Sequence, residues 1–418
     1  MVDETERFPM HPCHNGESSN LPIGTRIEFH RRRHGLSRRA LANLIGRSEE
    51  WLRLIETGQL QLDSVRVVTR LAYVLRIDDL RELIDWPTSP IPSTRAPCAD
   101  ARNFIRAILT SPVPQGNSRR WCAPKTDELH AMMDRCIDLW QHSPSRYSAL
   151  MISLPEALAT SLQAFLATMD AEHGFITARV HQLASNYLNR AGLPWLACVA
   201  GDRATRIGDH LRQPALSAAG AWHVGHALLL LGLPHQALDH VTVALEQLGR
   251  AKSIGPEREV LRGALRLTQA QASAAAGDLR TATQLMAQAN APTAPSPDQS
   301  AFGITFGTSR LRLAQLELAL ETGDFTEVTR LATQLETPDD SPVADRAAYH
   351  LQVAYAFACR NDDIAAAFSL TKAANLSVEE LYYNPYGRNT LKQLIRHDNC
   401  LVNDDIIRLI QKMSTVES

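Results

Sequence analysis

Apolar residues repeat at helical spacing in two short blocks near the start of the chain: Leu36, Leu41, Leu44 and Ile45, and then Leu52 and Ile55. Gly46 predicts a turn between the blocks, and Ser48 is placed to cap the second helix by accepting from its first free backbone N–H groups. Two short helices joined by a turn of about three to four residues that contains glycine are typical of a helix-turn-helix. In that motif the second helix enters the major groove of DNA. The pattern therefore predicts a DNA-binding segment.

Apolar positions on either side of this pair continue the helical spacing. Ile23 and Ile27 give a preceding helix one apolar stripe, and Gly35 ends that helix. The same spacing predicts a fourth and a fifth helix on downstream apolar positions: Val68, Leu71, Ala72 and Leu75, and then Leu80, Leu83 and Ile84. We therefore expect five short helices over residues 21–85.

This five-helix pattern resembles the phage-repressor-like, or xenobiotic-response-element (XRE), family of DNA-binding domains. The resemblance depends on residues at fixed offsets: Leu36, Ser37, Leu41, Ala42, Gly46, Leu52, Ile55, Glu56 and Gly58. It implies a DNA-binding domain over 21–86, whose second helix of the pair reads base edges with its first residues. The DNA-contacting residues that we expect on this basis are Arg38, Arg39, Asn43, Arg47, Ser48, Glu49, Glu50 and Arg53.

Glu49 and Glu50 are discordant members of that set, because phosphates repel a carboxylate that faces DNA. A carboxylate helps only if it accepts a hydrogen bond from the exocyclic amine of cytosine. The alternative is that the two glutamates stabilise the positive N-terminus of their own helix. Both interpretations stay open.

The charge of the chain supports DNA binding locally but not globally. The whole chain has 43 basic and 45 acidic residues, and a net charge of −2 predicts no general affinity for polyanions. Residues 26–47, however, contain seven arginines and one acidic residue, Glu28. Such a cluster is what phosphate contacts need. The alternative is a solvated, arginine-rich helix face.

The composition is that of a globular protein, 44% hydrophobic and 21% charged. No apolar run approaches the roughly 18 residues of a membrane span, and the acidic start lacks the pattern of a signal peptide. The seven cysteines are scattered and never form C-x-x-C, which fits a reducing cytosol. His11, Cys13 and His14 offer metal ligands, but a disordered polar tail is the preferred interpretation of this stretch. We expect a cytoplasmic protein with no membrane association, no metal and no cofactor.

Four prolines in residues 86–98 prevent a helix from continuing there. We therefore divide the chain into a disordered tail over 1–20, the DNA-binding domain over 21–86 and a proline-rich linker over 87–125. The linker holds one short helix at about 99–110. From Thr126 onward the texture is helical, with no convincing strand, so 126–418 is the remaining domain.

The region after Thr126 contains an internal repeat built on turn residues: Gly192, Gly232, Gly277, Gly323 and Asn361. The residue five positions later is alanine or valine: Ala197, Ala237, Ala282, Val328 and Ala366. Seven positions before the turn the residue is usually small: Ser185, Gly225, Ala270 and Ala354, with Leu316 as the exception. Twelve positions after it, alanine recurs: Ala204, Ala244, Ala289 and Ala373. Small residues at these positions let paired helices approach closely, and glycine or asparagine closes the hairpin.

These hairpins resemble tetratricopeptide repeats, with the extra length expected in the linkers between hairpins. The alternative is a generic α-helical bundle. A phage-repressor-like domain joined to tetratricopeptide repeats looks like actinobacterial regulators of two-part design. It is also similar in plan to the peptide-sensing (RRNPP-type) regulators of Gram-positive bacteria. In those proteins the repeats bind a signalling peptide and change how the DNA-binding domains are presented.

Stacked hairpins form a concave inner surface lined by the first helix of each pair. The position six residues before each turn faces that groove in the resembling fold, and here it is always polar: Asn186, His226, Gln271, Glu317 and Tyr355. The position four residues earlier is mostly apolar: Gln182, Trp222, Leu267, Leu313 and Leu351. A buried polar group without a partner costs about 1–3 kcal/mol, so the polar column predicts a wet groove or a bound peptide or amphipathic small molecule. The alternative is a column that is simply exposed.

Two further features, residues 302–310 and the pair His223 and His226, each allow two interpretations. The segment FGITFGTSR at 302–310 interrupts the helical texture and is either a lid over the groove or a long connection. His223 and His226 share a helix face at a spacing of three, which suits a metal or, preferably, packing in the core or groove. No phosphate-binding loop, nucleophile elbow or H-E-x-x-H motif supports an enzyme.

The sequence thus predicts an all-α transcription regulator: an N-terminal five-helix helix-turn-helix domain and a tetratricopeptide-like superhelix that dimerises and senses an effector. Its partners would be operator DNA, a second copy of the chain, and a peptide or small signalling molecule. The candidate ligand-binding residues are Gln182, Asn186, Trp222, His226, Gln271, Glu317 and Tyr355. The alternative functions are a scaffold whose repeats recruit a partner protein, and an interaction module that has lost DNA binding.

Overall fold

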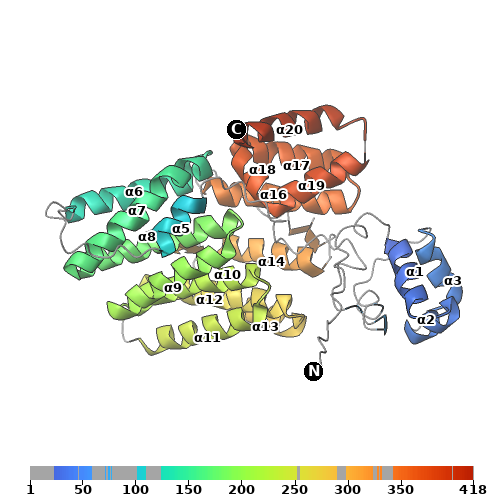
Figure 1. Ribbon diagram of the computed structural model, residues 1–418, viewed down its shortest axis with the longest axis horizontal. Helices are drawn as coiled ribbons and strands as arrows, with labels where there is room; N and C mark the ends of the chain where they lie inside the picture. Colours follow the sequence, from blue (N-terminus) through green and yellow to red (C-terminus); the bar gives the residue numbers. More distant parts are fainter. Residues whose placement is uncertain are drawn as a thin grey trace, which may run out of the picture. The chain divides into compact units, whose positions relative to one another are not determined.

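The computed structural model divides into two compact units, residues 1–89 and 90–418, which we call the head and the body (Figure 1). The structure describes residues 23–45, 47–58, 71, 74, 75, 77, 101–109, 124–251, 255–289, 298–322, 327–328, 330–331, 342–397 and 399–417.

The described part of the head contains three helices: α1 (Ile23–Arg33), α2 (Arg38–Ile45) and α3 (Glu49–Glu56). Gly35 ends α1 with a φ of 65°, and the Ser48 side chain caps α3 by accepting from the backbone N–H of Trp51 at 3.1 Å. The predicted helix-turn-helix pair is therefore confirmed. The core of the head consists of Ile27, Leu41, Ala42, Ile45, Leu52, Ile55, Leu71, Leu75 and Ile77.

Some positions in the head differ from the prediction or lie beyond what the structure describes. Leu44, expected on the buried stripe, is 50% exposed, because α2 turns that position away from α1 and α3. Gly46 lies outside the described residues, as do two positions of the expected fourth helix, Val68 and Ala72, and the fifth helix at 80–84.

Helix α1 crosses the end of α3 at very short range. A Cβ atom at Gly24 would overlap the carbonyl oxygen of Ile55 and lie 2.8 Å from that of Glu56. Glycine at this position therefore lets the backbones of α1 and α3 touch, which places the start of α1 directly over the last turn of α3.

The body is a stack of helices in chain order, with one small hairpin of strands (Figure 1). Its described helices up to the hairpin are α5 (Ala101–Leu109), α6 (Thr126–His142), α7 (Arg146–Thr168), α8 (Ala171–Arg190), α9 (Pro194–His210), α10 (Pro214–Leu230), α11 (Pro234–Arg250), α12 (Pro256–Ala275) and α13 (Leu279–Ala289). After the hairpin come α14 (Thr308–Thr322), α16 (Val343–Cys359), α17 (Asp363–Leu376), α18 (Val378–Tyr383), α19 (Pro385–His397) and α20 (Asn403–Glu417). The predicted all-α fold is confirmed.

The predicted turn residues close antiparallel helix pairs. Gly192, Gly232, Gly277 and Asn361 have φ angles of 81°, 73°, 86° and 60°, the left-handed region that glycine and asparagine tolerate. The residue five positions later is fully buried in each pair: Ala197, Ala237, Ala282 and Ala366. Gly323 lies outside the described residues, whereas Val328 is described and buried.

Small residues set the distance between the paired helices. A Cβ atom on Gly225 of α10 would lie 2.5 Å from the Val241 Cγ1 atom of α11. The Ser185 hydroxyl of α8 donates to the Ala197 carbonyl of α9 at 2.8 Å. A larger side chain at these positions would separate the helices, so the repeat pattern read from the sequence is a packing requirement.

The sequence predicts that the extra length of the repeats lies in the linkers between hairpins, and for the interval from Gly192 to Gly232 this prediction is wrong. Between Gly192 and Gly232 the chain forms two 17-residue helices, α9 and α10. The loop that joins them is Leu211–Gln213, in which Arg212 has a φ of 54°. The additional residues therefore lengthen the helices, because each loop is closed by a single left-handed residue and needs no more chain.

The segment at 302–310 was not expected to form strands, yet it contributes to an antiparallel hairpin. Strand β1 (Gln299–Ala301) pairs with β2 (Ile304–Phe306), and Phe302 and Gly303 form the turn with φ angles of 51° and 75°. Each strand has three residues, too few for alternation to stand out in the sequence. Phe306 is buried against α12, so the hairpin is anchored to the body.

Helix α5, which the sequence placed in the linker, belongs to the core of the body. Its Phe104 side chain is fully buried and stacks on the Tyr187 ring of α8, with the ring centroids 5.0 Å apart. Residues 101–109 therefore belong to the packed body and not, as the sequence had indicated, to a linker.

Among the described helices, α7 has the length and apolar composition of a membrane span. It nevertheless packs as a core helix: Leu150, Leu154 and Leu158 are fully buried in the cluster that also holds α5, α6 and α8. This stretch does not stand out in the sequence, because Pro155 and several small polar residues divide its apolar run.

The short helix α18 connects the end of the body to its beginning. The Glu379 carboxylate accepts from the backbone N–H groups of Tyr147 at 2.7 Å and Ser148 at 3.2 Å, which satisfies free donors at the start of α7. Glu380 forms a fully buried ion pair with Arg146, and the Tyr383 ring stacks on Tyr147 with centroids 4.1 Å apart. Helices that are more than 200 residues apart in the chain are thus joined by buried charge.

The packing of the hairpin on α12 can be tested with Gly263→Ala. A Cβ atom there would overlap the Phe306 ring, and overpacking of this kind costs about 1–3 kcal/mol. We expect a lower midpoint of thermal unfolding by circular dichroism. The matched control is Gly249→Ala on α11, where a Cβ atom meets nothing within 4 Å and alanine stabilises a helix by about 0.5–1 kcal/mol. Equal midpoints for the two variants would contradict the packing.

Candidate functional site

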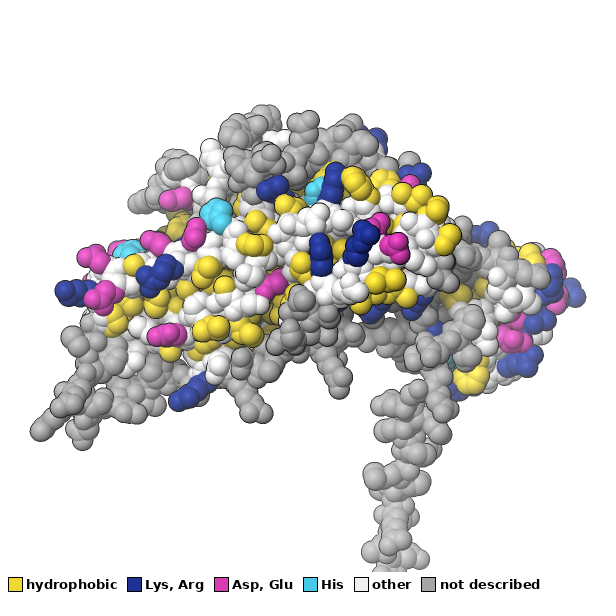
Figure 2. All heavy atoms as spheres, turned by 90° about the horizontal axis from the view of Figure 1, so that it is seen from above, with side chains coloured by type: hydrophobic (Ala, Val, Ile, Leu, Met, Phe, Trp, Pro, Cys, Tyr) yellow, Lys and Arg dark blue, Asp and Glu magenta, His cyan; other side chains and the backbone are white. Residues whose placement is uncertain are grey.

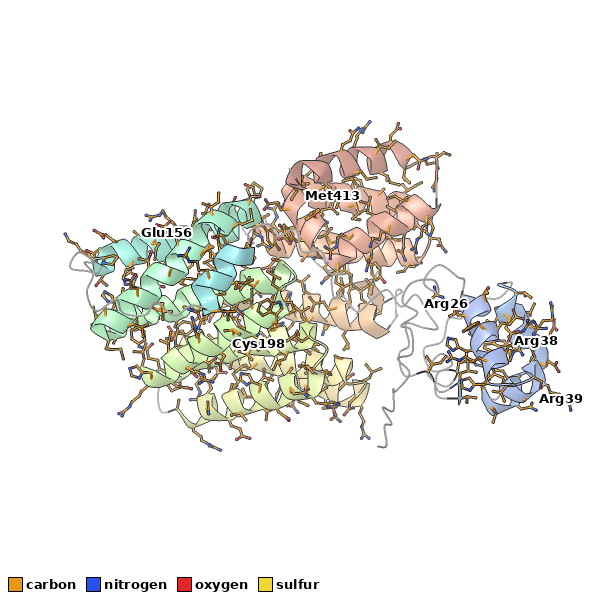
Figure 3. The ribbon with its side chains drawn as sticks, in the orientation of Figure 1. Arg26, Arg38, Arg39, Glu156, Cys198 and Met413 are labelled. Carbon is orange, nitrogen blue, oxygen red and sulfur yellow. The ribbon has the colours of Figure 1, made fainter. Side chains whose placement is uncertain are left out.

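The predicted DNA-contacting residues lie on α2, on the turn after it and on α3. Most of these side chains are exposed: Arg39, Asn43, Arg47, Ser48, Glu49 and Glu50. Arg38 and Arg53 are half-buried. Arg38 and Arg39 are consecutive residues at the start of α2 (Figure 3). The structure therefore leaves most of the set accessible on one pair of helices.

Arg38 is committed to an ion pair inside the head. Its Nε donates to the Glu56 Oε2 atom at 2.6 Å, and the Arg31 Nε donates to the Glu56 Oε1 atom at 2.6 Å. The Glu56 side chain is fully buried, whereas that of Arg38 is 35% exposed. One carboxylate of α3 thus holds guanidinium groups of α1 and α2, which joins all three helices.

The pKa of Glu56 reflects this arrangement. Burial of the carboxyl group acts to raise its pKa, but hydrogen bonds from Arg31 and Arg38 outweigh burial and lower it below the usual range. Glu56 is therefore charged at neutral pH, and its negative charge offsets part of the positive charge of Arg38.

The two discordant glutamates have different surroundings. Glu50 accepts from Arg53 at 2.7 and 2.9 Å, and this pairing lowers the pKa of Glu50. Glu49 makes no ion pair with the described residues and lies in the first turn of α3, where a carboxylate favours the helix dipole. The positive charge of Arg53 is thus partly neutralised. The predicted phosphate contact would require the Arg53 guanidinium to bind Glu50 and a phosphate at the same time.

The arginine cluster of residues 26–47 is smaller on the surface than in the sequence. Arg26 and Arg31 are buried, and Arg32 pairs with Glu28 at 2.6 Å. Arg38 is held by Glu56, as described above. The exposed arginines of the cluster that form no ion pair with described residues are Arg33, Arg39 and Arg47. Arg47 lies over the Trp51 ring, 5.6 Å from its centroid.

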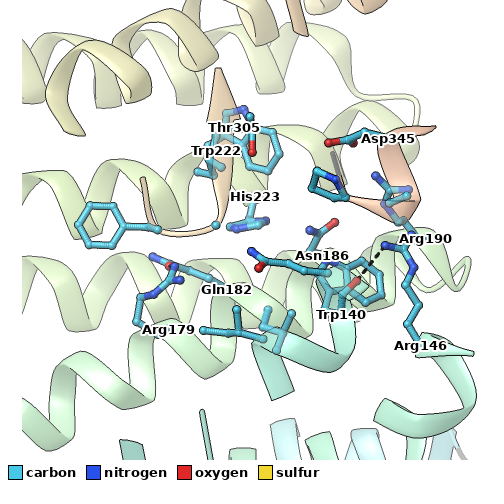
Figure 4. A pocket seen from close by; sticks show the side chains of 18 of the residues that line it. Trp140, Arg146, Arg179, Gln182, Asn186, Arg190, Trp222, His223, Thr305 and Asp345 are labelled. Atoms are coloured by element: carbon cyan, nitrogen blue, oxygen red, sulfur yellow. Dashed lines mark hydrogen bonds between the residues drawn. The ribbon is translucent and has the colours of Figure 1, made fainter. Parts of the chain in front are cut away.

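The inner surface of the body holds a pocket with a volume of about 120 Å³. Helix α8 contributes side chains at helical spacing, including the predicted ligand residues Gln182 and Asn186, and α10 contributes Trp222. The β1–β2 hairpin contributes Phe302 and Thr305 to the lining, and Figure 4 shows Thr305 beside Trp222. The structure therefore brings together three of the seven predicted ligand-binding residues. A second cavity of about 310 Å³ lies between α6 and α7, is lined in part by Glu128, Arg135 and Glu156, and holds none of the predicted ligand-binding residues.

Three other predicted residues form contacts between neighbouring repeats. His226 lies against the Trp222 ring with centroids 4.1 Å apart, and its Nε2 is 3.3 Å from the Thr268 hydroxyl. Burial lowers the pKa of His226 to about 3, so the ring is neutral. Gln271 donates to Glu317 at 2.8 Å. These polar groups of the column are therefore partnered by protein.

The last member of the column lies apart from the pocket. Tyr355 is buried against the Tyr386 ring, with centroids 5.4 Å apart, and burial raises the pKa of its hydroxyl. It is not among the side chains that line the pocket. It packs instead in the cluster formed by α14, α16 and Tyr386.

Sequence reasoning missed most of the charge in this pocket. Arg179 and Arg190 lie on the same face of α8 as Gln182 and Asn186, at offsets of three and four residues, so the helical period would have found them. Arg310 and the buried His223 also line the pocket. Within the described part of the chain, no three His, Cys, Asp or Glu side chains gather in a way that would hold a metal ion.

Comparison with known proteins bears first on the head. Residues 23–84 match the family model of a helix-turn-helix domain. The head is a helix-turn-helix domain. No curated protein matches the chain. Among solved structures, the crystal structure of Bacillus thuringiensis PlcR in complex with the peptide PapR7 and DNA is 10% identical, with 88% of this chain and 98% of that chain covered. Its TM-score is 0.26, too low for that likeness to add to what the helices themselves show.

The Arg31–Glu56–Arg38 network of the helix-turn-helix head can be tested with Glu56→Gln. The loss of charged hydrogen bonds costs about 1.5–3 kcal/mol, so backbone amides of residues 23–58 should exchange faster with solvent at pH 7, as measured by mass spectrometry of the intact protein. Because the folded pKa of Glu56 is lowered, its stabilisation is complete above the unfolded pKa of about 4.3. It is lost as the pH falls through the folded value.

The matched control for this variant is Glu49→Gln, an exposed carboxylate in the first turn of the same helix. It should leave exchange in the head nearly unchanged. Faster exchange throughout the body, or equal effects of the two variants, would show that the network does not stabilise the head.

Proposed function

We propose that this protein is a DNA-binding transcription regulator of the cytoplasm, with a head of the XRE type that binds an operator and a body that binds an effector. The observation that carries the proposal is the helix-turn-helix domain over residues 23–84. The exposed residues on α2 and at the start of α3 support a docking face for DNA. The role is binding rather than catalysis.

The proposed DNA contacts divide by chemistry. Arg39 and Arg47 are exposed cations that form no ion pair with described residues, so they are suited to phosphate contacts. Glu49 is exposed in the first turn of α3, whose N-terminal residues meet base edges when α3 enters the major groove, and Asn43 is an exposed polar group of α2 that we assign to the same docking face. Ser48 already accepts from the Trp51 N–H group, so its role is first to orient α3.

The double variant Arg39→Ala and Arg47→Ala tests the phosphate contacts. Affinity for any duplex should fall, and the slope of log K against log salt should become shallower by about 0.9 for each phosphate contact that is lost. Fluorescence anisotropy with a random-sequence duplex and with a duplex selected from a random pool measures both quantities.

The control for that experiment is Arg250→Ala, an exposed arginine of the body, which should leave affinity and slope unchanged. Arg38→Ala is a less direct probe, because it also removes a partner of Glu56. If the double variant retains the wild-type slope on both duplexes, the proposed docking face is incorrect.

We further propose that the protein works as a homodimer, because one helix-turn-helix buries too little surface for tight operator binding. Apolar side chains stand exposed on the C-terminal helices: Ile364 and Phe368 on α17, and Ile407 and Ile410 on α20. Ile364 and Phe368 are one helical turn apart and are 58% and 61% exposed. Hydrophobic side chains are also seen among charged ones on the face in Figure 2. These residues support the body as the source of the dimer contact.

Light scattering on the intact protein tests the dimer. We expect twice the chain mass of 46.2 kDa for the wild type, and a shift toward the monomer for Phe368→Glu, because a buried unpaired carboxylate disfavours association. Val243→Glu on α11, which is 54% exposed in the wild type, serves as the control and should stay dimeric. A wild-type mass of one chain would contradict the proposal.

A further inference from the structure

The pocket on the inner surface of the body is built from many separate elements. Helices α6, α8, α10, α14 and α16, the start of α7 and the β1–β2 hairpin each supply at least one lining side chain. The volume of about 120 Å³ is well above the roughly 10–15 Å³ that one water molecule needs. It is smaller than the roughly 300–1,000 Å³ of a typical ligand site, so the pocket is suited to one end of a ligand.

Positive charge lines this pocket. Its arginines come from three helices: Arg146, Arg179, Arg190 and Arg310. Glu380 lies behind the wall, where it forms the buried pair with Arg146 and is 3.6 Å from Arg190. One carboxylate thus serves both of these guanidinium groups.

The other carboxylates near the pocket are Glu317 and Asp345. Glu317 lies 3.8 Å from the Arg310 guanidinium and also accepts from Gln271 and Gln352. Asp345 lines the pocket, and its negative charge acts to raise the pKa of Arg190. Within the described residues, these three carboxylates act on Arg146, Arg190 and Arg310, and none of them forms an ion pair with Arg179.

Arg179 is therefore the least compensated of the four guanidinium groups. It makes no ion pair within the described residues; its Nη1 donates to the Gln182 side chain at 2.9 Å, and its guanidinium lies 5.6 Å from the Phe302 ring centroid. Burial lowers the pKa of Arg179 to about 10, and the exposed Asp134 acts on it only from a distance. A half-buried cation in contact with an amide and an aromatic ring gains from an anion.

His223 adds an unsatisfied group beside Arg179. Its side chain is 3% exposed, and its Nδ1 has no hydrogen-bond partner among the described residues. Arg179, Gln182, Asn186 and His223 converge on the same space (Figure 4). A buried nitrogen without a partner costs about 1–3 kcal/mol, so a ligand that meets it gains that energy.

We propose that this pocket binds the carboxylate end of the effector, with Arg179 as the principal anion contact and Gln182, Asn186 and His223 as polar contacts around it. The inference rests on the proposed effector-binding role of the body. A carboxylate carries a single negative charge, which matches the one guanidinium of the pocket that lacks an ion pair within the described residues, and a guanidinium holds it with two parallel hydrogen bonds. A phosphate dianion would leave a buried negative charge uncompensated.

The rest of the effector would extend along apolar surface. Trp222 and the hairpin residues Phe302 and Ile304 line the same pocket beside the polar groups. Two sources share this chemistry, the C-terminus of a short peptide and a small organic acid. In either case the ligand end would lie beside the hairpin, because Phe302 contacts both Arg179 and the Phe175 ring of α8.

The probes are two pools of N-acetylated random pentapeptides without Asp or Glu, one with free C-terminal carboxylates and one amidated. A parallel set contains phenylacetate, indole-3-acetate and hexanoate with their amides. Compounds retained by the full-length protein after rapid gel filtration are identified by mass spectrometry, and their Kd values are measured by calorimetry. We expect the protein to retain acids in preference to the matching amides. Retention from the peptide pool or from the small acids identifies the source.

Arg179→Gln should weaken binding of a retained acid at least tenfold, and Arg179→Lys should weaken it less, because it keeps the charge but not the fork of two donors. The control Arg206→Gln removes an exposed arginine of α9 and should leave Kd unchanged. Circular dichroism checks that the variants remain folded. Retention of amides as strongly as acids, retention of no acid at all, or a wild-type Kd for Arg179→Gln would each overturn the proposal.

The DNA-binding assay separates this inference from the proposed function. If the protein binds DNA but the acids are not preferred, the regulator stands and only the carboxylate site fails. If the wild-type protein binds no DNA, the proposed function fails, whatever the pocket binds.

Discussion

Close approach of helix backbones is the constraint on which both units depend. In the head, Gly24 lets α1 contact the last turn of α3. In the body, Gly225 and the buried alanines after each turn let paired helices pack at short range. Dense packing of this kind holds the functional side chains in place, because a shift of one helix is transmitted directly to its neighbour. The exposed face of α3 and the lining of the pocket are both set by these contacts.

Much of the fold could be predicted from periodicity and turn chemistry. Ser48 as a cap and Gly192, Gly232 and Gly277 as left-handed turn residues each have a local physical cause, so a single sequence suffices to find them. The β1–β2 hairpin could not be found in this way, because strands of three residues leave no pattern and depend on burial of Phe306 against α12.

The sites were harder to predict because charge partners come from distant parts of the chain. The sequence suggests seven arginines for DNA, but Glu56 and Glu28 engage several of them inside the head. The sequence predicts that the polar column lines one groove, yet Gln271 and Glu317 form a hydrogen bond with each other while Asn186 lines the pocket. Spacing along a helix gives the direction of a side chain, but not which group will meet it.

The contact between α18 and α7 has a mechanical consequence. A stack of helical hairpins with free ends can change its curvature easily. Here Arg146 at the start of α7 and Glu380 of α18 form a buried ion pair between an early and a late helix of the stack. Breaking such a pair leaves an uncompensated buried charge, at a cost of about 3–5 kcal/mol. The buried pair therefore resists separation of α7 from α18, and because Glu380 also lies 3.6 Å from Arg190 at the pocket wall, the same carboxylate connects this contact to the pocket.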